Sequence, residues 1–126
     1  MIPKKILIID KAPSITTIFE FILAQSGYQV LTSNSSSTAL NILKKTRDIS
    51  LLFLDYNMPK IENTPLHQKI QSISPLALTI FMSGQHYEKL LQDAYKANAY
   101  SILYKPFDIE EVLSQIKIIF KTVTEK

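Results

Sequence analysis

Four polar residues follow short apolar runs, and their types suit the transfer of an anionic group. Asp10, Asp55 and Ser83 each stand at the end of such a run, and Lys105 comes shortly after a fourth. In open α/β sheets the carboxyl ends of parallel strands share one edge, where these folds bind ligands. The four side chains are therefore expected to converge on one cleft. A carboxylate supported by a hydroxyl and an ammonium group can accept a phosphoryl group, because this chemistry needs mainly positioning and charge neutralisation.

The elements that must position these residues alternate between strand-like and helical patterns. Runs rich in leucine and β-branched residues predict strands at residues 5–9, 28–32, 50–54, 78–82 and 101–103. Each run is followed by apolar residues at three- and four-residue spacing, which is typical of amphipathic helices. They are Ile15, Ile18, Phe19, Ile22 and Leu23; Leu40, Ile42 and Leu43; Ile70 and Ile73; Leu90, Leu91 and Ala94; and Val112, Leu113, Ile116 and Ile119.

Three of these helices carry recognisable start signals. The Ser35–Ser37 cluster offers N-cap hydroxyls, Thr64 precedes a proline at the expected first helical position, and Asp108 forms a capping box with Glu111. Strands that alternate with helices in one short chain predict a parallel sheet with both faces covered. The fold class is therefore α/β, a single doubly wound five-stranded parallel sheet with five helices, forming one domain over residues 1–126.

Composition excludes several classes of protein. The chain is 46% hydrophobic and 20% charged, as expected of a globular domain, and its net charge of +3 without a basic stripe argues against direct nucleic-acid binding. It lacks cysteine, a signal-peptide layout and an apolar run of about 20 residues, so we expect a cytoplasmic protein without a membrane span. Its two glycines form no phosphate-binding loop of the common nucleotide-binding types. His67 and His86 are isolated and are interpreted as surface residues.

The polar strand ends belong to four short motifs whose order and spacing resemble those of response-regulator receiver domains. The motifs are Ile6-Leu7-Ile8-Ile9-Asp10, Leu54-Asp55-Tyr56-Asn57-Met58-Pro59, Met82-Ser83-Gly84 and Lys105-Pro106-Phe107. The likeness covers essentially all 126 residues. It implies the flavodoxin-like receiver fold and a signalling role in two-component systems, not that of an enzyme. A sensor histidine kinase or a histidine phosphotransfer protein would be the phosphoryl donor.

The resemblance also implies a role for each matching residue. Asp55 would accept the phosphoryl group, Lys105 would pair with a phosphoryl oxygen, and the Ser83 hydroxyl would bond to the group and report phosphorylation. Pro106 would follow a cis bond. The plainer alternatives are an aspartate that caps a strand, a surface lysine beside a turn and a serine that caps the fourth helix.

The expected metal site departs from the family pattern at one position. Receivers carry two adjacent acids at the end of the first strand, whereas this chain has Asp10 followed by Lys11. For Mg²⁺ this leaves Asp10, Asp55 and the backbone carbonyl of Asn57, so we expect binding to be weak or absent. An ammonium group about 4 Å from a cation costs about 4 kcal/mol at an effective dielectric of 20. Lys11 could instead lie between Asp10 and Asp55 in place of the metal, or extend into solvent.

The switch and one turn also differ from the family pattern. Receivers place Tyr or Phe where this chain has Ile102, and isoleucine cannot signal by exposing an aromatic ring. Tyr104 shares that side of the strand and either substitutes for the missing ring or is an ordinary half-buried tyrosine. Asn63 replaces a glycine, but asparagine tolerates the left-handed backbone, which preserves the turn.

Two functional hypotheses remain open. In the first, the chain is a receiver that is phosphorylated on Asp55, with an altered metal site and switch. In the second, it is a pseudo-receiver in which a contact between Lys11 and Asp55 locks one conformation for protein interaction or dimerisation. In either case the resemblance places partners, including a possible second copy, on the face formed by the fourth helix, the fifth strand and the fifth helix.

Overall fold

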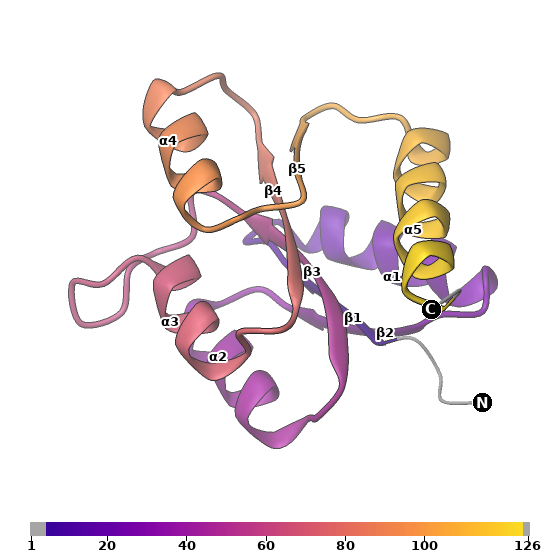
Figure 1. The fold of residues 1–126 in the computed structure, drawn as a ribbon, viewed down its shortest axis with the longest axis horizontal. Helices are drawn as coiled ribbons and strands as arrows, with labels where there is room; N and C mark the ends of the chain where they lie inside the picture. Colours follow the sequence, from indigo (N-terminus) through magenta and orange to yellow (C-terminus); the bar gives the residue numbers. More distant parts are fainter. Residues whose placement is uncertain (1–4, 125–126) are drawn as a thin grey trace.

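One parallel sheet organises the chain. The computed structural model describes residues 5–124, with side chains up to Lys121. The strands are β1 (Lys5–Ile9), β2 (Gln29–Ser33), β3 (Ile49–Asp55), β4 (Leu78–Ser83) and β5 (Ser101–Tyr104), in the sheet order β2-β1-β3-β4-β5. They alternate with helices α1 (Pro13–Gln25), α2 (Ser36–Lys45), α3 (Leu66–Ile73), α4 (Glu88–Lys96) and α5 (Ile109–Thr124). The predicted doubly wound α/β fold is confirmed, with strand bounds within two residues of the prediction (Figure 1).

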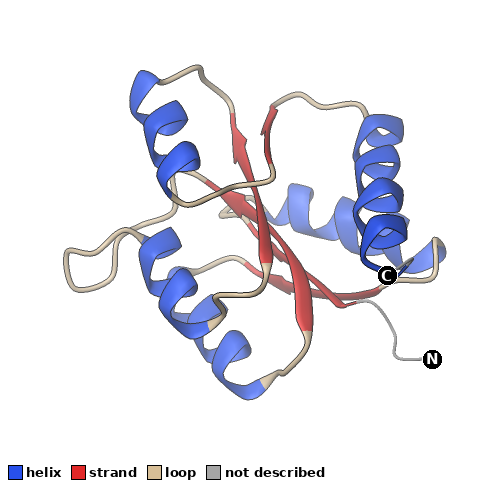
Figure 2. Ribbon diagram, in the orientation of Figure 1, coloured by secondary structure: helices blue, strands red, loops and turns tan. Residues whose placement is uncertain are grey.

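The helices form a layer on each face of the sheet. Helices α1 and α5 lie on one face, and α2, α3 and α4 lie on the other (Figures 1 and 2). Alternate residues of β3 pack against the two helical layers, because successive side chains of a strand point to opposite faces. Leu52 and Leu54 pack with the α2–α4 layer, whereas Leu51 and Phe53 pack with the α1–α5 layer. Burial on both faces explains why β3 is an uninterrupted apolar run.

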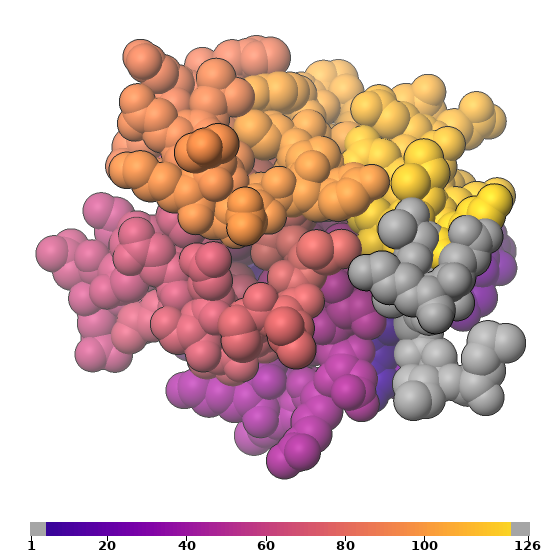
Figure 3. Space-filling view, viewed as in Figure 1, coloured from indigo at the N-terminus to yellow at the C-terminus, as the bar shows by residue number. Residues whose placement is uncertain are grey.

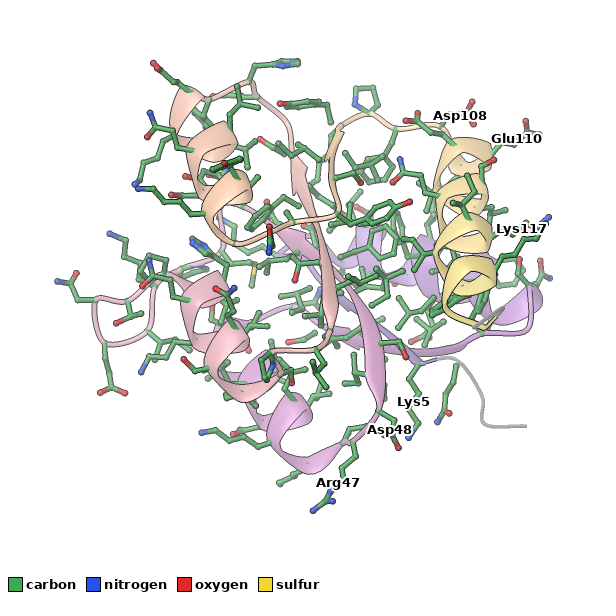
Figure 4. The ribbon with its side chains drawn as sticks, in the orientation of Figure 1. Lys5, Arg47, Asp48, Asp108, Glu110 and Lys117 are labelled. Atoms are coloured by element: carbon green, nitrogen blue, oxygen red, sulfur yellow. The ribbon has the colours of Figure 1, made fainter. Side chains whose placement is uncertain are left out.

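Two helix starts follow from their capping residues. The side chain of Ser35 accepts a hydrogen bond from the Thr38 N–H at 3.2 Å, so the serine cluster does begin α2. Asp108 begins α5 by accepting the Glu110 N–H at 2.9 Å, and Figure 4 shows both residues at this end of the helix. The predicted cap at Asp108 is thus confirmed, but the predicted capping box with Glu111 is not, because the side chain of Asp108 accepts the Glu110 N–H instead.

Three details of the helix predictions are wrong. Helix α3 has Pro65, not Thr64, as its N-cap, because Thr64 exchanges backbone hydrogen bonds with Ile61 in the preceding loop. Ile18 and Leu91 are 53% and 55% exposed, although their spacing placed them on buried faces. In both helices the apolar stripe is wider than the surface that contacts the sheet.

None of the helices within residues 5–124 has the length and apolar character needed to cross a bilayer.

Parallel pairing brings the polar strand ends to one edge of the sheet. Ile9 is level with Leu54 in the β1–β3 pair, so Asp10 and Asp55 emerge side by side. Ser83 is level with Tyr104 in the β4–β5 pair, which places Lys105 one residue further along. At the opposite end of the strands, the Lys5 ammonium donates to the Arg47 carbonyl at 3.2 Å, and both residues lie in the lower half of Figure 4.

Candidate functional site

The two predicted carboxylates lie next to each other and are almost fully buried. Asp10 is 1% exposed and Asp55 is 6% exposed. A backbone amide orients each one: the Ala12 N–H donates to Oδ1 of Asp10 at 2.9 Å, and the Asn57 N–H donates to Oδ1 of Asp55 at 3.1 Å. In both residues Oδ2 is left for other partners.

Lys105 lies between the two carboxylates. Its Nζ is 2.7 Å from Oδ2 of Asp10 and 3.9 Å from Oδ2 of Asp55, and its side chain is only 25% exposed. The Lys105–Pro106 bond is cis. A charge-assisted contact as short as the one to Asp10 is among the stronger side-chain interactions. Lys105 is therefore not the surface lysine of the alternative interpretation.

Lys11 does not occupy the position that we considered for it. The Lys11 side chain is exposed and forms no ion pair within 4 Å among the described residues. It is still close enough for its charge to act on Asp55. The ammonium between the carboxylates is that of Lys105, because this residue extends β5 into the cleft whereas Lys11 lies in the bend that precedes α1.

The Ser83 side chain is fully buried at the end of β4. Its Oγ donates to the carbonyl of Gln85 at 2.6 Å and accepts the N–H of the same residue at 3.1 Å. It is not a helix cap, because α4 begins at Glu88 with Tyr87 as the N-cap. The hydroxyl therefore organises the loop between β4 and α4, at the same edge of the sheet as the two aspartates.

Residues 61–64 form the predicted turn with left-handed backbone. Asn63 has φ of 64°, and its neighbour Glu62 has φ of 50°. The expectation that asparagine would preserve this turn in place of glycine is confirmed.

The predicted switch residues lie on β5. Ile102 and Tyr104 are both half-buried against the cluster of α2, α3 and α4. The Tyr104 ring stacks on the exposed His86 ring, with centroids 3.8 Å apart and planes inclined by 18°. His67, by contrast, is not a surface histidine: it is half-buried and lies edge-on to Phe81 at 5.5 Å.

The residues present form a reduced site for Mg²⁺. Two carboxylates and the Asn57 carbonyl are available in principle, but Lys105 already engages Oδ2 of Asp10 and the Ala12 N–H engages Oδ1. Within residues 5–124 no cluster of three acidic, histidine or cysteine side chains could hold a metal ion. A cation would have to displace an ammonium group without gaining a third carboxylate, so the donor set does not fit a strong Mg²⁺ site.

The environment of Asp55 disfavours its charged form. Burial raises the pKa of its carboxyl above 3.8, and the neighbouring Asp10 raises it further; the Asn57 N–H, Lys105 and Lys11 lower it. The net direction is upward. Folding therefore costs this group free energy wherever it must be ionised.

We expect Asp55→Asn to stabilise the protein at pH 7 by about 0.5–2 kcal/mol, the usual range of single stabilising substitutions. Because the folded-state pKa is raised, the wild type loses stability as pH rises from about 3.8 through that pKa. The advantage of the variant should thus disappear at pH values below 3.8. Urea unfolding of both proteins at pH 3 and pH 7 measures this difference, and equal stability at pH 7 would contradict it.

Three residues that support the site, Tyr56, Asp93 and Asn34, could not be assigned this role from the sequence. Tyr56 donates its hydroxyl to Oδ2 of Asp93 on α4 at 2.8 Å. The Asn34 amide donates to the Asp10 carbonyl at 2.8 Å and to Oγ1 of Thr16 at 3.1 Å. The signal in the sequence was the acidic residue Asp93, which lies between Leu90 and Ala94 on the apolar side of a predicted helix and therefore needs a polar partner.

Residues 6–117 match the family model of the response regulator receiver domain. The alkaline phosphatase synthesis transcriptional regulatory protein PhoP of Bacillus subtilis is 29% identical over 94% of this chain, which spans about half (49%) of that protein. Sporulation initiation phosphotransferase F of the same organism is 26% identical over 93% of this chain and 94% of its own length.

Solved structures show the same fold. A CheY-like receiver domain protein from Methanospirillum hungatei superposes with a TM-score of 0.88 at 23% identity, covering 98% of each chain. A receiver domain protein from Clostridium thermocellum gives 0.83 at 27% identity over 96% of this chain and 97% of its own. This chain therefore belongs to the response regulator receiver domains of two-component signalling.

Proposed function

We propose that this chain, as a single receiver domain over residues 1–126, accepts a phosphoryl group on Asp55. The observation that carries the proposal is the position of this carboxylate. It is buried at the tip of β3, with one oxygen fixed by the Asn57 N–H and the other facing the Lys105 ammonium. A nucleophile held in this way needs little reorganisation to react.

The reaction would be an in-line displacement. Oδ2 of Asp55 attacks phosphorus, the bond between phosphorus and the donor's imidazole nitrogen breaks, and the imidazole leaves with the electron pair and takes up a proton. Lys105 is 3.9 Å from the attacking oxygen and would neutralise charge on the phosphoryl oxygens. The Ser83 hydroxyl would exchange its Gln85 partner for a phosphoryl oxygen.

Magnesium would be a weak cofactor here. When bound, the ion would hold the phosphoryl oxygens through Asp10, Asp55 and the Asn57 carbonyl. In this chain Lys105 is already 2.7 Å from Asp10 and supplies part of the same positive charge. We therefore propose that phosphorylation depends on Mg²⁺ less than a three-acid site would require.

Receiver domains interact with histidine kinases or phosphotransfer proteins, and we propose the same donors for Asp55. The face of α4, β5 and α5 is the proposed surface for downstream partners or a second copy of the chain. Leu91 and Tyr95 stand one turn apart on α4 and are 55% and 87% exposed, with Tyr100 nearby in sequence at 44%. Exposed large apolar side chains so close together are typical of interaction surfaces.

Intact-mass measurement after incubation with acetyl phosphate tests phosphorylation. We expect the wild type to gain one phosphoryl group and Asp55→Ala to gain none, because both oxygens of the other buried carboxylate, Asp10, are already engaged, by Lys105 at 2.7 Å and by the Ala12 N–H at 2.9 Å. The reaction is run with and without Mg²⁺.

The control is Asp48→Asn, which removes an exposed carboxylate at the opposite end of β3, keeps a residue that tolerates the left-handed backbone there (φ 68°), and should leave the adduct unchanged (Figure 4). A wild type that gains no phosphoryl group with either donor class, acetyl phosphate or a phosphorylated histidine protein, would contradict the proposal. The pseudo-receiver would then be favoured, locked through Lys105 and Asp10 rather than through Lys11.

A further inference from the structure

The residue that follows the acceptor is bonded to α4. The Tyr56 hydroxyl donates to Oδ2 of Asp93 at 2.8 Å across 37 positions of the sequence. The other end of Tyr56 is also fixed, since its N–H donates to the Met82 carbonyl at 2.8 Å. Its ring lies edge-on to Phe81 at 5.9 Å. The turn after Asp55 is therefore anchored to β4 by its backbone and to α4 by a side chain.

Helix α4 has few other attachments to the domain. Only Leu90 and Ala94 of its nine residues are buried, and the helix lies at the edge of the molecule, above α3 (Figures 1 and 3). The hydrogen bond from Tyr56 to Asp93 can thus contribute a sizeable part of the free energy that keeps α4 docked against the rest of the domain. A hollow of about 260 Å³, lined by Asp55, Tyr56 and Asp93 among others, lies between the turn after Asp55 and this helix.

The hydrogen bond between Tyr56 and Asp93 is expected to persist at physiological pH. Burial and the nearby Asp93 raise the pKa of the Tyr56 hydroxyl to about 12, so it keeps its proton and remains a donor at physiological pH. The other partner of Asp93 is Lys89 at 3.8 Å, whose side chain is 77% exposed. An exposed pair of that kind contributes little. Asp93 itself is only 15% exposed, so the tyrosine hydroxyl is its main partner.

We propose that Tyr56 and Asp93 are positioning residues whose hydrogen bond couples the turn after Asp55 to α4. This inference rests on the proposed phosphorylation of Asp55. The hydrogen bond would transmit the effect of the phosphoryl group from the turn after Asp55 to the exposed surface of α4. At equilibrium the coupling is reciprocal: a restraint on α4 must alter the free energy of adduct formation at Asp55 by as much as the adduct alters the equilibrium of α4.

The first measurement is amide hydrogen exchange of α4 in the unmodified full chain. Tyr56→Phe keeps the ring and removes the donor, and we expect α4 amides to exchange about tenfold faster, as loss of one bond to a charged acceptor implies. Tyr95→Phe is the matched control, because it makes the same change on α4 at a side chain that is 87% exposed. Amides of β1 and β3 should be unaffected. Unchanged α4 exchange in Tyr56→Phe would overturn the proposal.

Rescue by a conservative variant separates positioning from general damage. Asp93→Asn keeps a carbonyl oxygen for the tyrosine hydroxyl and should behave like the wild type, whereas Asp93→Leu should match Tyr56→Phe. The double variant Tyr56→Phe/Asp93→Leu should show no additional effect. Equal behaviour of Asp93→Asn and Asp93→Leu would mean that the charge of Asp93, not the bond, matters, and would overturn the proposal.

The second measurement follows the same variants after reaction with acetyl phosphate, with adduct formation monitored by intact mass. Tyr56→Phe and Asp93→Leu should form the adduct roughly three- to tenfold more slowly, because the turn that orients Asp55 has lost an anchor. Their α4 exchange should also respond less to the adduct than that of the wild type. An adduct with the same α4 response in wild type and Tyr56→Phe contradicts the coupling alone. The absence of an adduct on the wild type contradicts the proposed function, and with it the signalling role of this bond.

Discussion

Lys11→Asp is expected to bind Mg²⁺ about a hundredfold more tightly than the wild type. The substitution removes an ammonium whose charge acts on Asp55 and supplies a third carboxylate beside Asp10. Two unit charges of exposed side chains a few ångströms apart interact by about 1 kcal/mol, and reversal of the sign doubles the effect before any new ligand is counted. The new carboxylate also gives the ion a direct oxygen ligand. Titration calorimetry with Mg²⁺ alone measures the change.

Two control variants separate the effect of a carboxylate at position 11 from the effect of the change in net charge. Lys44→Asp makes the same change in net charge on the exposed surface of α2 and should leave Mg²⁺ affinity near that of the wild type. Lys11→Gln removes the ammonium without adding a ligand and should give an intermediate affinity. If Lys11→Asp binds Mg²⁺ no better than Lys44→Asp, then Lys11 is not what limits the site.

The fold could be predicted from sequence because its determinants are local. Strands buried on both faces must be continuous apolar runs, and amphipathic helices between them leave a parallel sheet as the consistent arrangement. Topology then brings Asp10, Asp55, Ser83 and Lys105 to one edge without any information on distances. The limits of this reasoning appear at Ile18 and Leu91, where apolar residues at helical spacing are exposed.

The ion pairs and hydrogen bonds within the site could not be predicted in the same way. Both Lys11 and Lys105 have side chains long enough to lie between the carboxylates, and only the direction of the backbone at the bend before α1 and at the end of β5 decides between them. The bond from Tyr56 to Asp93 joins residues that no periodicity relates. Contacts of this kind depend on the docking of α4, which is a tertiary property.

Lys105→Met is expected to destabilise the protein at pH 7 by about 2–3 kcal/mol. Loss of one partner from a buried pair leaves an uncompensated charge, which costs 3–5 kcal/mol in full burial, and the 25% exposure of Lys105 reduces this figure. Asp10 and Asp55 would then face each other without a cation between them. Because Lys105 lowers the pKa of Asp55, its removal raises that pKa further. The penalty should therefore grow as pH rises through this higher pKa and shrink in acid, where the carboxyl is protonated.

The same substitution should slow adduct formation at Asp55 by at least about a hundredfold, the usual cost of removing one preorganised group that stabilises developing charge. Urea unfolding at pH 4 and pH 7 and intact mass after acetyl phosphate treatment measure the two effects. Lys117→Met, an exposed lysine of α5, is the matched control and should change neither (Figure 4). The double variant Asp55→Asn/Lys105→Met decides the origin of the instability. Partial recovery relative to Lys105→Met means that carboxylate repulsion causes the loss, whereas no recovery would assign it to the lost packing of the lysine stem.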